Sequence, residues 1–424
     1  RFNSQVNGYF LCDRGRFGYE YVNSPHRIKR AVVRQERHQS QSGTAEGGPQ
    51  PLEFAADCLR QARGIVGIGS PRASLEANVA LQSLVGPQNF YQGIDQQKGQ
   101  LLSTILKVLQ TGPVPSASIH DAEQSDAVFV LGADLLNEAP RLALALLQSI
   151  RQQPMEQVDE LKIPRWDEAA VRNAVQNRRG PLFLAGYQRT WFHEYATDTY
   201  FAAPDDIARL GFAVAGSIGQ GAPSVSDLST EVKDLTQRIA EALTHAQRPL
   251  IIAGTESGSQ ATIEAAANVA WALHQQGKQP RLSFVLPECN SAGLAFLGGG
   301  SLNDAFDAIC QGKADTVIVL ENDLYRRADQ ANVDAFFEAA QTVVVIDSVE
   351  NRTTAHADVL LPAATGPESD GTFVNQEGRA QRFYQVFVPD GDVKESWRWL
   401  SHLGRAISQE SGSETGVAVW RNFD

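Results

Sequence analysis

The chain has 424 residues, of which 42% are hydrophobic and 20% are charged, a composition typical of a globular protein with two or three domains. Its formal net charge of −12 argues against binding to a nucleic-acid backbone by bulk electrostatics. There is no apolar run of about 18 residues, so we expect no membrane-spanning helix. The beginning has no signal-peptide pattern, and because it starts with Arg1 we expect a fragment of a longer chain.

Residues 1–50 differ from the rest of the chain in composition. Tyr9 to Tyr21 is aromatic and Gly-rich, His26 to His38 is basic, and Gln39 to Gly48 has the low complexity of a linker. The basic stretch has two interpretations, a solvated linker or a segment that binds an acidic partner. Four scattered cysteines fit a reducing compartment better than a disulfide framework: Cys12, Cys58, Cys289 and Cys310.

From Pro51 onward, short apolar runs alternate with helical periodicity, which predicts parallel sheets with crossover helices. Residues 151–180 are charged and show no clear pattern. Helices are expected from Pro140, over Gln260–His274, and after Ser70 as N-cap with a stop at Gly86. The expected strands are Ile65–Gly69, Ala127–Leu131, Phe183–Gly186, Leu250–Gly254, Ser283–Leu286, Thr316–Leu320, Thr342–Asp347 and Ala357–Leu361.

Two glycine-rich turns have the composition of phosphate or anion sites. Gly67 to Arg72 lies between a strand and a helix, but Arg72 replaces the third glycine of the dinucleotide fingerprint and no acidic residue ends a second strand. A tight strand-to-helix turn is therefore favoured. Gly298 to Ser301 precedes another helix with Ser301 as N-cap. Its amides would either cradle an anion or form a turn that needs positive φ.

Zinc-protease, structural-zinc and α/β-hydrolase motifs are missing from the sequence. For His356 we expect a surface or hydrogen-bonding role rather than catalysis. Cys12 lies between aromatic residues, a pattern that by itself indicates a small buried apolar side chain. A 4Fe–4S cluster needs four thiolates, and Cys58 is separated from Cys12 by the linker.

The most distinctive block runs from residue 343 to 382 and contains A-D-V-L-L-P, E-S-D-G-T-F-x-N and E-G-R-x-Q in that order. It resembles the molybdopterin oxidoreductase superfamily, the large subunits of formate dehydrogenase-like enzymes. Further segments are similar to the same superfamily: Phe10–Tyr21, Gly69–Val85 and Ser125–Pro140. The resemblance implies an α/β fold with Rossmann-like, doubly wound parallel sheets and discontinuous domains, as in domains 1–3 of the formate dehydrogenase and DMSO reductase type.

The resemblance also implies domain boundaries. Residues 1–50, with a hairpin near 366–390, would be the remnant of a 4Fe–4S cluster domain. Residues 51–115 and 246–350 would form one Rossmann-like domain, with Ile65–Gly69, Leu250–Gly254 and Thr316–Leu320 as neighbouring strands. Residues 116–245 would be an inserted α/β domain, and residues 391–424 a C-terminal helical segment.

Several positions depart from the superfamily's pattern. Arg14 stands where the family has a Lys, and Asp134 where it has an Asn. The resemblance also implies that Asn375 and Arg379 stand at altered positions that lie next to the pterin or the cluster in the family. Between Phe90 and Asp126 there is no cysteine to bind molybdenum, and the C-terminal barrel of the family is absent. The resemblance therefore implies that the molybdenum site is lost, and that Cys12 is the last of four ligands to a 4Fe–4S cluster whose other three cysteines lie outside this chain.

Within the superfamily, the combination resembles the large peripheral-arm subunits of bacterial respiratory complex I, on the segments Arg72–Asn78, Val319–Leu324, Glu368–Thr372 and Glu395–Leu400. This implies a scaffold and shield for an iron–sulfur cluster inside an oxidoreductase, not catalytic by itself. Phe10, Phe17 and Tyr19 would keep water from the cluster. The implied partners are other peripheral-arm subunits, with no nucleic acid and no membrane insertion. The implied location is the cytoplasmic side of the inner membrane.

Two alternatives remain open. One is an active molybdenum or tungsten bis-pterin oxidoreductase of the formate dehydrogenase type, which would need a serine or an unusual residue as metal ligand. The other is a nucleotide-binding module that uses the turn from Gly67 to Arg72.

Overall fold

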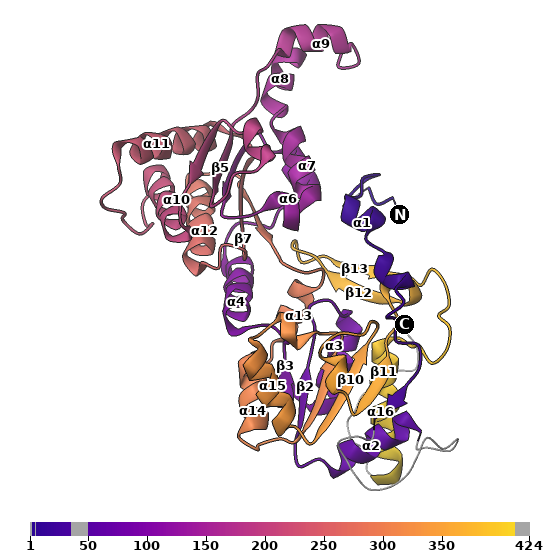
Figure 1. The fold of residues 1–424 in the computed structure, drawn as a ribbon. Helices are drawn as coiled ribbons and strands as arrows, with labels where there is room; N and C mark the ends of the chain where they lie inside the picture. The colour runs from indigo at the N-terminus through magenta and orange to yellow at the C-terminus, as the bar shows by residue number, and fades with distance from the viewer. Residues whose placement is uncertain (1, 5, 35–49, 412–424) are drawn as a thin grey trace. The chain divides into compact units, whose positions relative to one another are not determined.

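The computed structural model describes residues 2–4, 6–34 and 50–411 (Figure 1). The chain divides into two compact units. Unit 1 contains Arg1–Arg16, Gln100–Pro287 and Gln376–Gly378, and unit 2 contains Phe17–Gly99, Glu288–Asn375 and Arg379–Asp424. None of the helices within the described ranges is both long and apolar enough to cross a bilayer.

Unit 1 is built on a five-stranded parallel sheet in the order β6-β5-β4-β7-β8. The strands are β4 (Ala127–Leu131), β5 (Leu182–Gly186), β6 (Asp198–Phe201), β7 (Pro249–Gly254) and β8 (Arg281–Val285). The helices are α4 (Gln96–Thr111, which starts in unit 2), α5 (Ile119–Gln124), α6 (Leu135–Glu138), α7 (Pro140–Ser149), α8 (Gln152–Glu160), α9 (Glu168–Val175), α10 (Pro204–Ile218), α11 (Thr230–His245) and α12 (Gln260–Gln275), with the 3-10 turn η3 (Trp191–Tyr195).

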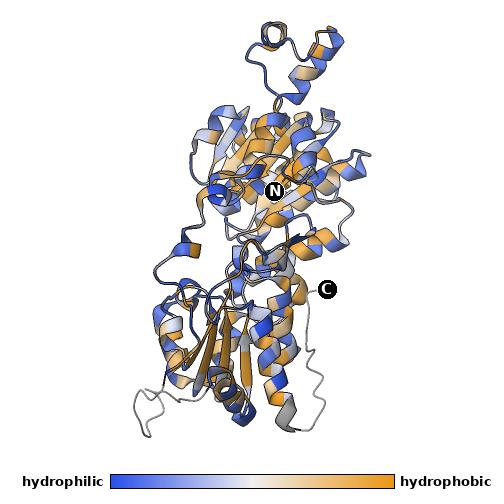
Figure 2. Cartoon of the chain, turned by 90° about the vertical axis from the view of Figure 1, so that its right-hand side faces the viewer, coloured by the Kyte–Doolittle hydropathy of each residue, from blue (hydrophilic) through white to orange (hydrophobic). Residues whose placement is uncertain are grey.

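Helices cover both faces of this sheet because successive side chains of a strand point to opposite faces. In β4, Phe129 and Leu131 pack into a core with α10 and α12, whereas Val128 and Val130 pack into a second core with α5 and α7. Both faces of β4 are thus apolar, and the strand is a continuous hydrophobic run. Figure 2 shows hydrophobic residues concentrated in the interior of the sheet-containing parts of the chain, with hydrophilic residues toward their outer helix faces.

Unit 2 is built on a six-stranded sheet in the order β1-β11-β10-β9-β2-β3, in which only β1 is antiparallel to its neighbour. Its strands are β1 (Val32–Val33), β2 (Ile65–Ile68), β3 (Phe90–Tyr91), β9 (Thr316–Leu320), β10 (Thr342–Asp347) and β11 (Val359–Pro362), and a separate hairpin pairs β12 (Gly371–Val374) with β13 (Ala380–Phe383).

The helices of unit 2 are α2 (Pro51–Gln61), α3 (Leu75–Val85), α13 (Ser291–Leu297), α14 (Leu302–Cys310), α15 (Gln330–Ala339) and α16 (Ser396–Ser411). The 3-10 turns are η1 (Glu20–Asn23), η2 (Pro87–Asn89), η4 (Leu324–Arg326), η5 (Thr354–His356) and η6 (Gly366–Glu368), and the short helix α1 (Asp13–Phe17) spans the boundary between the units.

The sheet order corrects one expected neighbourhood. Leu250–Gly254 does not lie beside Ile65–Gly69; it forms β7, which pairs with β4 and β8 in unit 1, while β2 pairs with β9 and β3. Residues 100–115 and 246–287 lie in unit 1 with the expected inserted domain, and the described part of residues 1–50 divides between the two units. All these strands are buried apolar runs, so their patterns do not specify which one pairs with which.

A second correction concerns the start of the helix after β2. Ser70 was expected to be its N-cap, but α3 begins at Leu75, and Ser74 accepts a hydrogen bond from the Ala77 amide at 3.1 Å. The hydroxyl of Ser70 donates instead to the Glu321 carbonyl. Gly86 ends the helix as expected, with φ of +86°. The linker from Gln39 to Gly48, Arg37 and residues 412–424 lie outside the described residues.

Candidate functional site

In unit 2, the order of the sheet reverses between β2 and β9, because the chain goes from β2 to β3 on one side and returns to β9 on the other. In doubly wound folds, ligands bind in the crevice at the carboxyl ends of two such strands. Gly69 and Ser70 follow β2 there, and Glu321 and Asn322 follow β9. This crevice is the candidate site of unit 2.

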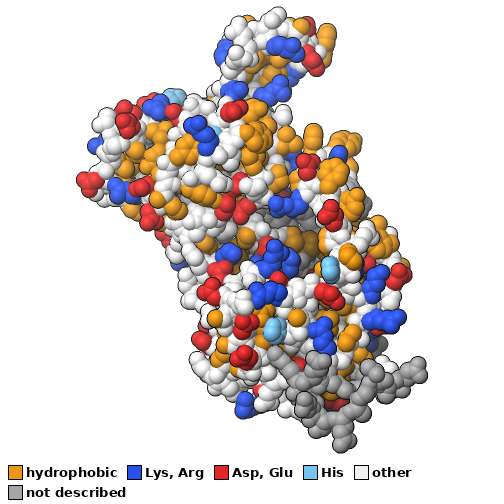
Figure 3. Space-filling view, viewed as in Figure 1, with side chains coloured by type: hydrophobic (Ala, Val, Ile, Leu, Met, Phe, Trp, Pro, Cys, Tyr) orange, Lys and Arg blue, Asp and Glu red, His pale blue; other side chains and the backbone are white. Residues whose placement is uncertain are grey.

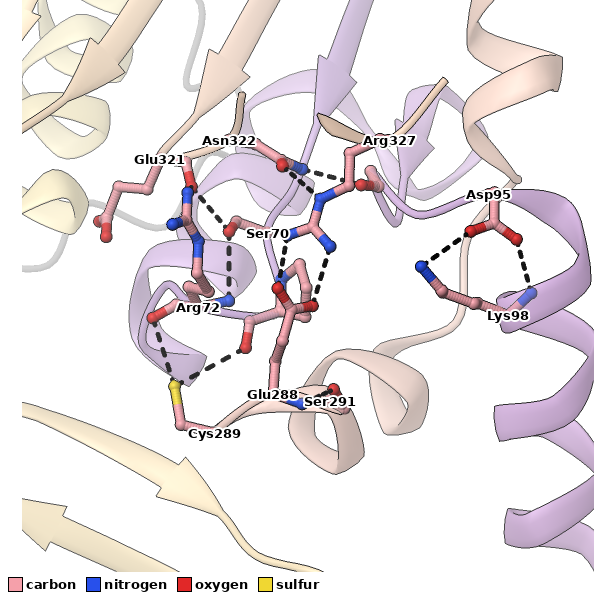
Figure 4. A network of polar contacts seen from close by, with 12 residues as sticks. Ser70, Arg72, Asp95, Lys98, Glu288, Cys289, Ser291, Glu321, Asn322 and Arg327 are labelled. Carbon is pink, nitrogen blue, oxygen red and sulfur yellow. Dashed lines mark hydrogen bonds and ion pairs between the residues drawn. The ribbon is translucent and has the colours of Figure 1, made fainter. Parts of the chain in front are cut away.

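Side chains of unit 2 bridge the crevice through hydrogen bonds (Figure 4). The side-chain amide of the buried Asn322 donates to the carbonyls of Gly69 at 2.9 Å and Gly93 at 2.8 Å. The Ser70 hydroxyl donates to the Glu321 carbonyl at 2.8 Å. The ends of β2, β3 and β9 are therefore tied directly to one another, in the place where a ligand phosphate would lie.

An ion pair lies over Asn322. The Arg327 guanidinium donates to Glu288 through two bonds of 2.6 and 3.1 Å, and its Nε donates to the Asn322 side-chain oxygen at 3.0 Å. The two charged side chains are only 11% and 20% exposed. A guanidinium that is engaged by a bidentate carboxylate and an amide has little capacity left for an anionic ligand.

The glycines of the first turn are explained by close packing. A Cβ on Gly69 would lie 2.6 Å from the Asn78 side-chain oxygen, and a Cβ on Gly93, where φ is +66°, would lie 2.1 Å from the Gly69 carbonyl. The amides of Gly69, Ser70 and Arg72 donate to Tyr91, Asn78 and Ser70 respectively. The turn from Gly67 to Arg72 is therefore a tight strand-to-helix turn.

The second glycine-rich turn extends the edge of the sheet. Gly298 and Gly299 have φ of +71° and +109°, and the Gly300 amide donates to the Phe90 carbonyl at 3.0 Å. The Ser301 amide donates to Asp304 within a capping box. These bonds favour a turn that needs positive φ over an anion cradle. The amides of Gly298, Gly300 and Ser301 all donate to the chain's own oxygens.

Glu321 has an unusual environment beside the crevice. Its backbone φ is +43°, and its carboxyl accepts a hydrogen bond from Ser396 at the start of α16. Desolvation raises the pKa of this carboxyl to about 7, and the nearby Asp347 carboxylate adds to the effect. Desolvation also raises the pKa of the buried Asp347. Sequence patterns did not point to either carboxyl, since both follow ordinary buried strands.

In unit 1, the equivalent reversal lies between β4 and β7, where Asp134 was predicted as a degenerate pterin-facing residue. Its carboxylate accepts from the amides of Leu136 and Asn137 and from the side chains of Asn137 and Gln188, so that it caps α6. The Asp134 amide donates to Glu256, which follows β7, at 3.1 Å. The Asp134 carboxylate therefore caps α6, the helix that follows it in the chain.

A small pocket of about 40 Å³ lies beside Asp134 at the ends of β4 and β5. Tyr187 and His193 line it. Desolvation and a hydrogen bond to Glu256 raise the pKa of Tyr187, and desolvation lowers the pKa of His193. Both side chains are therefore uncharged near neutral pH.

Cys12 is a free, partly exposed cysteine immediately before α1. Its sulfur accepts a hydrogen bond from the Gly15 amide at 3.3 Å. Among the described residues, no three His, Cys, Asp or Glu side chains are grouped so that they could hold a metal ion. Phe10, Phe17 and Tyr19, which were expected to shield a cluster, are 58%, 61% and 57% exposed.

The remaining predicted residues lie as follows. Asn375 and Arg379 face each other across the hairpin turn, where the Asn375 side-chain oxygen accepts from the Arg379 amide at 2.9 Å. Arg14 is exposed in α1. His356 makes a hydrogen bond of 2.7 Å with the Tyr325 hydroxyl and stacks on Phe337, in agreement with a hydrogen-bonding role.

Comparison with known proteins matches the chain to one family model and to several curated relatives. Residues 227–406 match the family model described as molybdopterin oxidoreductase. The chain is 49% identical over 408 residues to the G subunit of NADH-quinone oxidoreductase from Pseudomonas fluorescens, a match that covers 95% of this chain and 44% of that protein. It is 43% identical over 431 residues to the same protein of Shewanella oneidensis, covering 100% and 46%, and 42% identical over 408 residues to that of Escherichia coli K12, covering 95% and 44%. The chain thus spans less than half the length of these curated relatives.

Two solved structures share the fold. Acetylene hydratase from Pelobacter acetylenicus aligns with a TM-score of 0.59 at 14% identity, over 97% of this chain and 65% of that one. A chain of the formyltransferase/hydrolase complex from Methylorubrum extorquens aligns with a TM-score of 0.57 at 17% identity, over 90% and 100%. These alignments support the mixed α/β architecture with parallel sheets.

Proposed function

We propose that this chain, whose curated homologues are G subunits of NADH-quinone oxidoreductase, is the corresponding segment of such a subunit in respiratory complex I. In this role it is a scaffold built on a molybdopterin-type fold that has lost the metal site, and it supplies one ligand to an iron–sulfur cluster. The single observation that carries the proposal is the closed crevice of unit 2, in which Asn322 ties Gly69 to Gly93.

The residues present do not fit a molybdenum–pterin group. A cysteine can act as a metal ligand only as its thiolate. The cysteine beside the crevice is Cys289, whose sulfur lies 3.9 and 3.8 Å from the carbonyls of Pro71 and Arg72. Desolvation and the adjacent Glu288 carboxylate raise the pKa of this thiol to about 11, so it stays protonated at neutral pH.

The surroundings of Cys12 fit one corner of a 4Fe–4S cluster. Its sulfur is partly exposed and already accepts the Gly15 amide, the kind of N–H to sulfur contact that tunes cluster potential. Three further thiolates would have to come from outside this chain. A bound cluster would supply one-electron transfer. The role of this chain would be to fix Cys12 at the start of α1 and to offer exposed aromatics to the segment that carries the other ligands.

Partners and location follow from the same proposal. The other subunits of the peripheral arm would contact this chain, and it would reside on the cytoplasmic side of the bacterial inner membrane. The exposed side chains of Phe2, Tyr9, Phe10 and Leu11, which are 52%, 83%, 58% and 49% exposed, form an apolar surface suited to covering by another segment.

The test is metal analysis of the full-length subunit, with EPR spectra recorded after dithionite reduction. We expect iron and a reduced-cluster signal without molybdenum or tungsten. Cys12→Ser should remove about four iron atoms and one cluster signal, since four thiolates hold one such cluster. Cys310→Ser, which changes another free cysteine, is the control and should leave both the iron content and the cluster signal unchanged.

Two results would overturn the proposal. Stoichiometric molybdenum or tungsten would mean that the metal site survives. An unchanged iron content in Cys12→Ser would remove the cluster role assigned to this residue.

A further inference from the structure

Residues 151–180, the charged stretch without a clear pattern, form an arm of two helices, α8 and α9. A cavity of about 550 Å³ lies between these helices and the end of α7. We call it the arm cavity. Its lining includes three arginines, Arg151, Arg165 and Arg172, and one carboxylate, Glu168. Figure 3 shows cationic side chains on this arm, together with acidic and hydrophobic ones.

Two of these arginines differ from Arg141 and Arg238 of unit 1, which form ion pairs. Arg141 pairs with Glu123 at 3.5 Å and Arg238 with Asp198 at 3.0 Å. In the arm, Arg165 pairs with Asp159, and its Nε donates to that carboxylate at 2.9 Å. Within the described residues, the side chains of Arg151 and Arg172 have neither an ion pair nor a hydrogen bond, and both are exposed.

We propose that the arm cavity binds a phosphate-bearing anion. Guanidinium groups present planar pairs of N–H donors that match phosphate oxygens. Because Arg151 and Arg172 have no internal carboxylate, an anion would not have to break an existing ion pair to reach them. The volume falls in the range of small-molecule sites, about 300–1,000 Å³, which favours a compact ligand over a macromolecule.

The charge balance supports the same conclusion. Because Arg165 is paired with Asp159, the lining carries two unpaired positive charges, Arg151 and Arg172, against the one carboxylate of Glu168, in a protein whose net charge is −12. A local excess of positive charge in an acidic protein attracts anions to that place and not to the surface in general. The phosphate could belong to a free phosphorylated compound or to a lipid headgroup, and the chemistry recognised is the same.

The experiment is isothermal titration calorimetry of the purified protein with sodium pyrophosphate at low ionic strength. A second experiment measures flotation of the protein with vesicles of phosphatidylglycerol and, separately, with vesicles of phosphatidylcholine. Binding of pyrophosphate alone assigns a soluble phosphate compound, and binding of phosphatidylglycerol vesicles assigns a lipid headgroup. Affinity should fall as salt is added, because exposed charges are screened.

The variant is Arg151→Gln/Arg172→Gln, which we expect to weaken binding at least tenfold. The matched control is Lys107→Gln/Lys233→Gln, which removes the same charge from exposed positions of α4 and α11 and should leave affinity unchanged. Thermal unfolding of both double variants checks the fold, which exposed substitutions rarely disturb. The proposal would be overturned if neither calorimetry nor flotation detected binding, or if the variant and the control weakened binding equally.

Discussion

Arg27 and Glu368, 341 positions apart in the chain, form an ion pair of two hydrogen bonds, 2.7 and 3.2 Å long. Their side chains are only 3% and 8% exposed. Arg27 also donates to the carbonyls of Val22 and Ser348, and Glu368 also accepts from Thr365 in the capping box of η6. The pair therefore fixes the segment before β1 to the turn that precedes the β12–β13 hairpin.

We predict that Arg27→Met lowers the free energy of unfolding of unit 2 by about 3–5 kcal/mol, because it leaves the Glu368 carboxylate buried without its partner. Urea denaturation followed by tryptophan fluorescence measures this, since Trp397 and Trp399 report on unit 2. Arg30→Met, an exposed arginine of the same basic stretch, is the control and should change stability by less than about 0.5 kcal/mol. Similar losses in both variants would contradict the buried pair.

Asn322→Ala should destabilise unit 2 by about 2–3 kcal/mol, because it leaves the Gly69 and Gly93 carbonyls without the side-chain donor that they share. Amide hydrogen exchange of β2 and β9 should increase together, since Asn322 links the ends of these strands. Asn332→Ala, at an exposed position of α15, serves as the comparison. An Asn322→Ala protein as stable as this comparison would mean that the crevice is not held by these bonds.

Gly371, in the E-S-D-G-T segment, is required for space: a Cβ there would lie 2.8 Å from the Ser74 Cβ and 2.4 Å from the Phe383 ring. We predict that Gly371→Ala costs about 1–3 kcal/mol through overpacking and speeds exchange of the Thr372 amide, which donates to Glu76 of α3. Gly378 has φ of +77° with open space around it. Gly378→Ala should strain only the turn and leave the Thr372 amide protected, and equal exchange in the two variants would refute the steric argument.

Glu321 predicts a pH dependence of stability. Its folded-state pKa is raised from 4.5 to about 7, so the folded state binds the proton more tightly than the unfolded state. The stabilisation is fully present below about pH 4.5 and is lost as pH rises through 7, an effect of roughly 3 kcal/mol. Glu321→Gln should therefore be more stable than wild type at pH 8, with the advantage shrinking by roughly 2–3 kcal/mol toward pH 5.

Urea midpoints measured between pH 5 and 8 test this prediction. The exposed Glu338→Gln is the control and should show the pH profile of the wild type. A Glu321→Gln profile parallel to that of the wild type would show that this carboxyl does not titrate in the folded state at these pH values.

Local features were predictable where they depend on neighbouring residues. The buried strands are apolar runs such as Ala127–Leu131 and Thr342–Asp347, and the structure confirms both with the same bounds. Gly86 as helix stop and Ser301 as N-cap depend on positive φ and on a hydroxyl next to free amides, which a short stretch of sequence shows directly. The Gly-rich hairpin was confirmed as β12 and β13.

The candidate site was less predictable, because it is made by contacts between distant positions. The pattern at Ser70 satisfied the rule for an N-cap, yet its hydroxyl bonds the Glu321 carbonyl, 251 positions away. Arg27 looked like part of a solvated basic stretch, and only its approach to Glu368 identifies it as buried. The arginines of the arm lay in a stretch without a usable pattern, since α9 has no buried residue to create periodicity.

The sequence by itself determined eight of the strands, the Gly86 stop, the Ser301 cap and the order of the distinctive segments, since these follow from side-chain size, branching and local hydrogen bonding. Only the tertiary structure decided that β7 pairs with β4, that Asn322 closes the crevice, and that Arg151 and Arg172 lack carboxylate partners among the described residues. Strand pairing, burial of charge and cavity shape depend on contacts between positions tens to hundreds of residues apart. The local sequence around an apolar strand or an arginine does not show which distant residues it will contact.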